Sequence, residues 1–197
     1  VETTVLQKLT GPLYAGVVVQ LSGSLARDVS PGVAADPDFQ RHGPTVVNTG
    51  LGLTVRYDSR DVPVNAWEGM LLAATLTGYA PVLGGTTSWS ALAVDYRHYL
   101  TLFRPGSTLA WQVKYRTTFG EVPWSELSLV GTPFDLRAYR WGQYRDRTSL
   151  TALVEYRFML PFPPENLWSH LGFAAWVGVG ALGPQPWPEL SHVLPAA

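Results

Sequence analysis

The chain has 197 residues and a net charge of −1, with 46% hydrophobic but only 15% charged residues. This length suits one domain over residues 1–197, and charged residues are scarcer than the roughly one quarter of a soluble domain. The near-zero charge argues against a nucleic-acid partner. The absence of cysteine excludes disulfides, thiolate metal sites and cysteine nucleophiles. The four histidines have no metal-ligand spacing, so we expect no metal and no cofactor.

Seven segments predict β-strands, because apolar and polar residues alternate in them and helical periodicity is nearly absent. In chain order, they cover residues 13–27, 45–57, 69–80, 89–103, 107–119, 149–160 and 171–182. Strands of soluble proteins typically have about 5 or 6 residues, whereas a tilted strand that crosses a bilayer needs about 9 to 11. The predicted segments are long enough to cross a bilayer. They predict an all-β fold, an antiparallel transmembrane β-barrel, and leave a soluble β-sandwich or lipocalin-like barrel as the alternative.

The fifth segment shows the alternation most clearly. Leu109, Trp111 and Val113 share one face of the strand, and Gln112 and Lys114 share the other. Lipid outside a barrel and a wet lumen inside require this arrangement. We therefore expect the apolar face to point outward and the polar face to point inward.

The connections between the predicted strands alternate in length, as they do in membrane barrels. FRPGS is short, DVSPGVAADPDFQRHGP is long and polar, and residues 120–147 form a very long loop. The seven strands are odd in number, and HVLPAA ends the chain with no closing strand evident. Because every strand edge in lipid must be paired, we expect the chain to be part of a larger barrel. VETTVLQKL is interpreted as the tail of an earlier strand.

The long loop ends in FDLRAYRWGQYRDR, which combines four arginines with four aromatic residues. Aromatic side chains prefer shelter, so we expect this stretch to fold back into the lumen. Phe134, Tyr139 and Trp141 would then pack against the wall or against other loops. The arginines of this stretch would form bidentate ion pairs with the carboxylates on the predicted lumen face, which are Asp58, Asp95 and Glu155.

LRAYRWGQYRDR and the following EYR resemble the Omp85, or bacterial surface antigen, superfamily. The sixth extracellular loop of that family carries an Arg-Gly-(Phe/Tyr) motif, and a strand with an acidic residue follows. The matching positions are Leu136, Arg137, Ala138 and Tyr139, then Glu155, with alanine in place of the motif glycine. The resemblance therefore implies that Arg137 is the arginine that forms a bidentate pair with Glu155. GQYRD is similar to the stand-alone surface antigens of the family.

Two further sets of residues belong to this resemblance. Some relatives place an aspartate as a second loop partner where this chain has Gly178, and Asp146 is the candidate substitute. GLGLTVRYDSRDVPVNAWEG resembles the family's strand and periplasmic turn. The turn motif residues are Tyr57, Asp58, Arg60, Asp61 and Gly69.

The resemblance implies a sixteen-stranded barrel in the bacterial outer membrane that inserts or translocates polypeptides. Its partners would be outer-membrane lipid and client β-barrel or secreted polypeptides, and it would not be an enzyme. Two alternatives stay open. One is a passive channel or structural surface antigen, and the other is an outer-membrane lipid hydrolase that uses a serine and His98.

Overall fold

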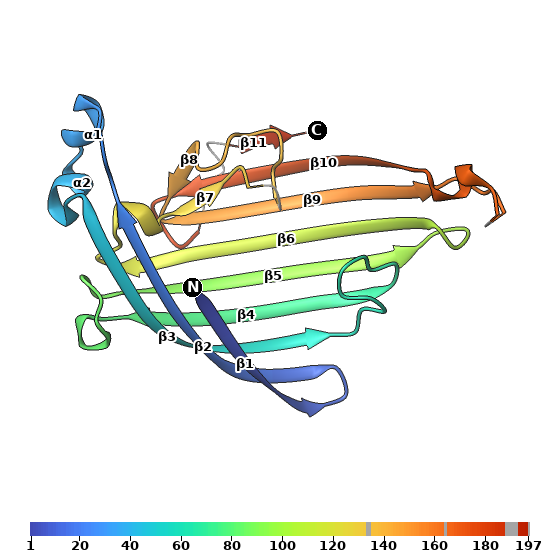
Figure 1. Cartoon of the computed structure of the whole chain (residues 1–197), viewed down its shortest axis with the longest axis horizontal. Helices are drawn as coiled ribbons and strands as arrows, with labels where there is room; N and C mark the ends of the chain where they lie inside the picture. Colours follow the sequence, from blue (N-terminus) through green and yellow to red (C-terminus); the bar gives the residue numbers. More distant parts are fainter. Residues whose placement is uncertain (133–134, 164, 188–192, 197) are drawn as a thin grey trace.

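The fold is known from a computed structural model, which describes residues 1–132, 135–163, 165–187 and 193–196. Most of the chain forms one antiparallel sheet. Its nine strands are β1 (Glu2–Thr10), β2 (Leu13–Leu25), β3 (Thr45–Asp58), β4 (Gly69–Tyr79), β5 (Trp89–Thr101), β6 (Ser107–Gly120), β9 (Thr148–Met159), β10 (Gly172–Gly183) and β11 (Val193–Ala196). They lie in chain order from β1 to β11. The sheet curves so strongly that β1 and β2 cross in front of the other strands (Figure 1).

All seven predicted strands are present, and each end lies within two residues of its predicted place. The strands form one continuous sheet rather than two packed sheets, as a barrel wall requires and a sandwich does not. The prediction of an all-β antiparallel fold is therefore confirmed.

The sheet has two strands beyond the seven predicted ones. VETTVLQKL, interpreted as the tail of a strand, is most of β1, which pairs with β2 from Glu2 to Thr10. At the other end, the segment interpreted as lacking a strand contains β11, which pairs with β10. β11 has four residues, and one of them is Pro195, which lacks a backbone N–H. So short a strand gives no alternation that a sequence can reveal.

Short elements occupy the connections. They are the α-helices α1 (Pro31–Ala34) and α2 (Pro37–His42), the 3-10 helices η1 (Pro81–Leu83), η2 (Trp124–Glu126) and η3 (Leu167–His170), and the strands β7 (Ser128–Val130) and β8 (Tyr144–Asp146). β7 and β8 pair as a hairpin inside the long loop, where no strand was predicted. Within the described residues, no helix has both the length and the apolar character to cross a membrane.

The two faces of the sheet differ as the alternation predicted. On the convex face, large apolar side chains are exposed along several strands, including Leu53, Val113, Val154 and Val177. The buried apolar clusters both involve the connection between β6 and β9, residues 121–147, which we call the docked loop. The core therefore lies where this loop meets the concave face, which we call the lumen.

The connections between strands lie at two ends of the sheet. The longer ones, with α1, α2 and the β7–β8 hairpin, lie at the left of Figure 1. The β1–β2, β3–β4, β5–β6 and β9–β10 turns lie at the right (Figure 1). We call the right end the turn end.

Candidate functional site: the docked loop in the lumen

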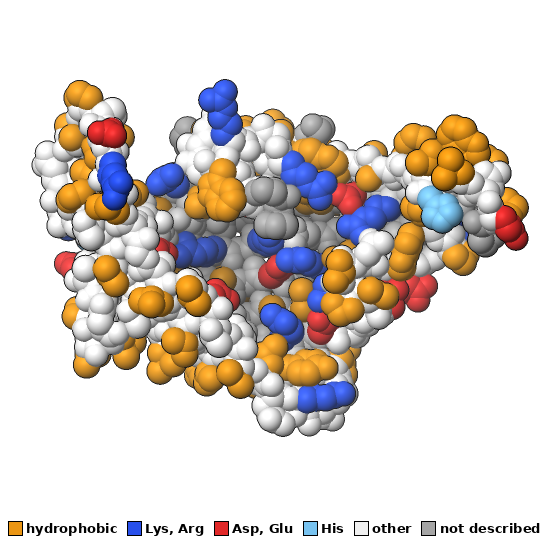
Figure 2. All heavy atoms as spheres, in the orientation of Figure 1, with side chains coloured by type: hydrophobic (Ala, Val, Ile, Leu, Met, Phe, Trp, Pro, Cys, Tyr) orange, Lys and Arg blue, Asp and Glu red, His pale blue; other side chains and the backbone are white. Residues whose placement is uncertain are grey.

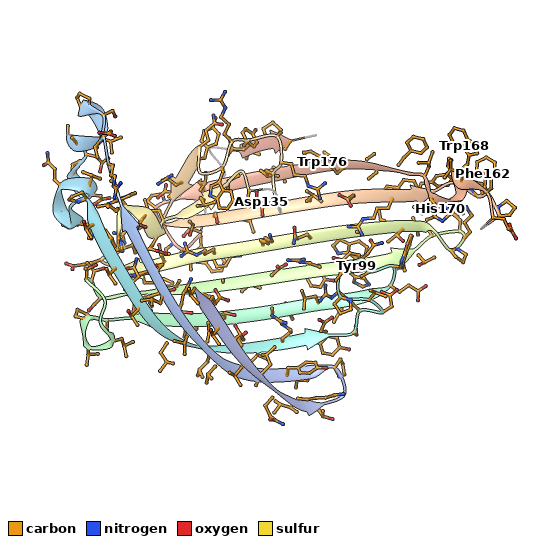
Figure 3. The ribbon with its side chains drawn as sticks, viewed as in Figure 1. Tyr99, Asp135, Phe162, Trp168, His170 and Trp176 are labelled. Carbon is orange, nitrogen blue, oxygen red and sulfur yellow. The ribbon has the colours of Figure 1, made fainter. Side chains whose placement is uncertain are left out.

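A buried aspartate shapes the part of the docked loop that carries the motif. The carboxylate of Asp135 accepts hydrogen bonds from the backbone N–H groups of Gly131, Thr132 and Leu136, at 3.2, 2.6 and 2.5 Å. Asp135 is 6% exposed, and its position above the lumen wall is marked in Figure 3. These bonds close a tight turn just before the motif. The sequence analysis overlooked Asp135, although an aspartate near glycine and threonine is a common turn signal.

Leu136, the first motif residue, packs directly on glycines of the lumen wall. Its side chain is fully buried. A Cβ atom added at Gly178 would lie 2.7 Å from Leu136 Cδ2, and one at Gly180 would lie 2.6 Å from Leu136 Cδ1. The wall therefore has glycine at these positions because the leucine fills the space. This contact also explains why position 178, where some relatives place an aspartate, has no side chain here.

Arg137 reaches the wall between an acidic and an aromatic residue. Its Nη2 lies 3.1 Å from Glu155 Oε2, and its guanidinium carbon lies 5.8 Å from the centre of the Trp176 ring. Glu155 and Trp176 are paired neighbours on β9 and β10. The expected bidentate geometry is absent, because the other carboxylate oxygen, Oε1, accepts from Arg157 Nε at 2.5 Å. One carboxylate thus serves two arginines, one from the loop and one from the wall.

The rest of the motif forms a turn and reaches β11. The backbone N–H of Tyr139 donates to Leu136 O at 3.2 Å, which closes a turn over Ala138. Ala138 is not among the described residues with positive φ, so alanine fits this turn without the freedom of glycine. The Tyr139 hydroxyl donates to Pro195 O on β11 at 2.6 Å.

The expectation that the loop's aromatic residues are sheltered holds only in part. Tyr139 is half-buried. Trp141 is 73% exposed, so the prediction for it was wrong. Phe134 lies outside the described residues.

Asp146 does not meet Arg137 within the described part of the chain. It pairs with Ser128 in the β7–β8 hairpin, and its carboxylate accepts from the backbone N–H of Arg147 at 2.6 Å. Asp146 therefore belongs to the hairpin of the loop and not to the part that carries the motif. A sequence cannot show this, because the two strands of the hairpin have three residues each.

A second attachment of the docked loop was missed by the sequence analysis. The side chain of Glu126 accepts from Ser22 Oγ on β2 at 2.7 Å and from Asn48 Nδ2 on β3 at 3.0 Å. Its backbone oxygen accepts from Arg116 Nη1 on β6 at 2.9 Å. The loop thus ties β6 to β3 and β2, which are three and four places away in the sheet order. Nothing near Glu126 in the sequence indicates these partners.

Arg60 and Asp58 of the turn motif form a bidentate pair at the end of β3. Arg60 Nε and Nη2 lie 2.8 and 2.7 Å from the two oxygens of Asp58. Arg60 Nη1 also donates to Pro63 O at 2.8 Å, so one guanidinium braces both sides of the turn. Tyr57 is half-buried in β3, where it pairs with Leu13 and with β4.

Asp61 and Gly69 close the same turn. Asp61 Oδ1 accepts from the backbone N–H groups of Trp67 and Glu68 at 3.1 and 3.3 Å. Slight desolvation raises the pKa of Asp61, but several backbone N–H donors lower it, and the net pKa lies below the usual value. Gly69 has φ +93°, and a Cβ there would lie 2.3 Å from Ser59 O, so only glycine fits.

The turn and the docked loop are linked through the lumen wall. Arg157, which shares Glu155 with Arg137, donates through Nη1 to Asn65 Oδ1 in the turn at 3.2 Å. Thr101 Oγ1 also donates to Trp67 O at 3.3 Å. A chain of side chains therefore runs from the loop motif to the opposite end of the lumen.

Charged side chains gather in the hollow of the molecule, with basic groups more prominent than acidic ones (Figure 2). The wall contributes a second bidentate pair, in which Arg97 Nε and Nη2 contact Asp95 at 3.0 and 2.6 Å. A cavity of about 130 Å³ lies between Arg97, Arg137 and Arg157. The lumen is thus lined by charged side chains at the place where the loop is docked.

The hydrolase alternative gains no support from the surroundings of His98. His98 Nδ1 lies 3.0 Å from the Tyr96 hydroxyl, and its ring stacks on Trp111 at 4.5 Å, on the convex face. A serine nucleophile is not among these recorded partners. In the part of the chain that the structure describes, no group of three potential metal ligands is present.

Comparisons with known proteins agree with this geometry. The model of the Omp85 superfamily domain matches residues 7–190. Among solved structures, the chain is similar to BamA from Haemophilus ducreyi lacking POTRA domains 1–3, with a TM-score of 0.59 and 13% identity. The match covers 85% of this chain and 38% of that chain. No curated protein matches the sequence significantly. The family match spans β2 to β10, the docked loop and the turn motif, and the chain belongs to the Omp85 superfamily.

Proposed function

We propose that this chain is part of a bacterial outer-membrane barrel that assists the insertion or passage of polypeptides. The observation that carries the proposal is the docked loop, anchored on the lumen wall by Leu136 and Arg137. Family membership and the apolar convex face support the membrane location. The clients would be β-barrel or secreted polypeptides.

Insertion by strand addition needs a wall that opens at one seam while its other strands keep their register. A client strand then pairs with the exposed strand edge through backbone hydrogen bonds. In this chain the docked loop supplies the brace. It holds β9 and β10 through Arg137 and Leu136, and it holds β2 and β3 through Glu126.

The test is a client-folding assay with the intact protein in lipid vesicles. We expect the wild type to accelerate folding of an added barrel polypeptide, measured as heat-resistant migration on a gel. Glu126→Gln and Arg137→Ala should each reduce the acceleration while the barrel itself stays folded. Arg140→Ala is the matched control, because Arg140 is an exposed cation of the same loop. No acceleration by the wild type would contradict the proposal.

A second candidate function is a passive channel, and the polar lumen favours it. Ion pairs line the wall, and the cavity beside Arg137 borders the loop. A loop that narrows a charged lumen is a familiar form of constriction. Steady conductance in planar bilayers, without any effect on client folding, would favour this function over the first.

A further inference from the structure

The β9–β10 turn exposes large apolar side chains where a polar turn would be usual. Leu167, Trp168 and Leu171 are 80, 56 and 46% exposed, and Phe162 is 45% exposed. Figure 3 marks Phe162 and Trp168 at the tip of this turn. A patch of apolar atoms gathers at the same end in Figure 2. Contiguous exposed apolar surface of this kind marks a contact with a partner or a membrane.

The neighbouring β5–β6 turn contributes to the same surface. Ser107 pairs with Phe158, and Met159 N donates to Gly106 O at 2.7 Å, so the two turns lie side by side. Phe103 in this turn is 95% exposed and has φ +62°. A left-handed backbone conformation is unfavourable for phenylalanine, and here it keeps the ring exposed.

The surface continues into the outward face of the sheet. Phe173, at the start of β10, is 68% exposed and pairs with Phe158 of β9. Phe158 lies on the convex face, in the same alternating row as Val154. The apolar turn surface is therefore continuous with the surface that faces lipid in the proposed function.

The chemistry of the two turns fits a lipid headgroup region. Tryptophan is favoured there because its amphipathic ring tolerates an apolar and a wet side together. Phenylalanine and leucine contribute apolar surface that is buried at the boundary between headgroups and acyl chains. Arg104 lies beside the patch, with its guanidinium carbon 4.6 Å from the centre of the Phe158 ring. An arginine at this level can keep its charged head at the phosphates while its stem lies on apolar surface.

We propose that the turn patch, formed by Phe103, Phe162, Leu167, Trp168, Leu171 and Phe173, inserts into the adjacent leaflet of the bilayer. The proposal rests on the proposed membrane location. The patch holds the turn end of β9 and β10 at a fixed depth in the bilayer. The docked loop lies toward the opposite ends of these two strands. Lipid is thus the partner of these turns.

Single cysteines can report the environment of the patch, because this chain has none of its own. Leu167→Cys, labelled with an environment-sensitive fluorophore, is measured in the intact protein reconstituted in phosphatidylcholine vesicles. Val64→Cys is the aqueous control, since Val64 is 96% exposed in the β3–β4 turn at the same end. Val113→Cys is the lipid control from the middle of β6.

We expect the label at position 167 to emit at shorter wavelength than the label at position 64. Lipids with brominated chains should quench it, and aqueous iodide should quench it only weakly. Iodide quenching at position 167 together with lipid quenching at position 113 would overturn the anchor and leave the barrel proposal intact. Protection from both quenchers at position 167 would indicate a protein cover and would also overturn it. Iodide quenching at position 113 would contradict the membrane location itself.

Discussion

Arg137→Ala and Glu155→Gln define a double-mutant cycle. We expect the two single variants to lower the free energy of unfolding by different amounts. The Arg137 side chain is 46% exposed, so water screens its pair with Glu155, and the pair is worth about 1 kcal/mol. Arg137→Ala leaves Glu155 paired with Arg157 and should destabilise the barrel by about that amount. Glu155→Gln removes the carboxylate that two guanidiniums share, at a site where Glu155 is only 6% exposed. It should cost about 3 kcal/mol, the lower end for breaking a buried pair.

Urea titration of the barrel in lipid vesicles gives the free energy of unfolding for each variant. The double variant should be less destabilised than the sum of the single variants, by about 1 kcal/mol. Arg140→Ala controls for a general loss of positive charge from the loop and should change little. Additive single effects, or equal costs for the two single variants, would refute the shared-carboxylate geometry.

Three further predictions concern facing, packing and pH. Val113→Arg should lower the free energy of unfolding in vesicles by about 2–4 kcal/mol, because position 113 lies on the convex face near the middle of the strand. Gln112→Arg, on the lumen face, should leave it nearly unchanged. Equal losses for the two variants in refolding titrations would contradict this facing. Gly178→Asp should destabilise the barrel by about 1–3 kcal/mol in urea titrations, because its side chain clashes with Leu136. Adding Leu136→Ala should restore part of this stability, and no restoration would contradict the contact between the two residues. Because the folded pKa of Asp61 is lowered, its contribution to the turn is complete above the unfolded pKa of about 3.9 and is lost as pH falls through the lower folded value. An NMR pH titration of the turn's amide protons should show this loss, and a change near neutral pH would contradict it.

The strands of the wall were predictable because lipid and lumen impose one pattern over many residues. In β6 the apolar side chains of Trp111 and Val113 alternate with Gln112 and Lys114 over a spanning length. The alternation becomes clearer with each residue of the strand, and a single residue that breaks it does not hide it. Three- and four-residue strands such as β7, β8 and β11 cannot accumulate it, and they were missed.

The docked loop was predictable only where a motif carried the information. The resemblance indicated that Arg137 and Glu155 are partners, but it could not show that Arg157 takes the second carboxylate oxygen. The contacts of Glu126 with Ser22 and Asn48 join residues 104 and 78 positions apart. Contacts so distant in sequence follow from the curvature of the sheet, which no local pattern reveals.

The position of the loop inside the lumen is the claim on which the account depends. It is tested most directly by cross-linking Leu136→Cys to Gly178→Cys in the intact, membrane-embedded protein with a short bifunctional thiol reagent. Trp141→Cys with Gly178→Cys is the matched control, because the Trp141 side chain belongs to the same loop and is 73% exposed. The account predicts rapid cross-linking of the first pair and little of the second. Equal cross-linking of both pairs, or none of the first, would contradict a loop docked on the lumen wall.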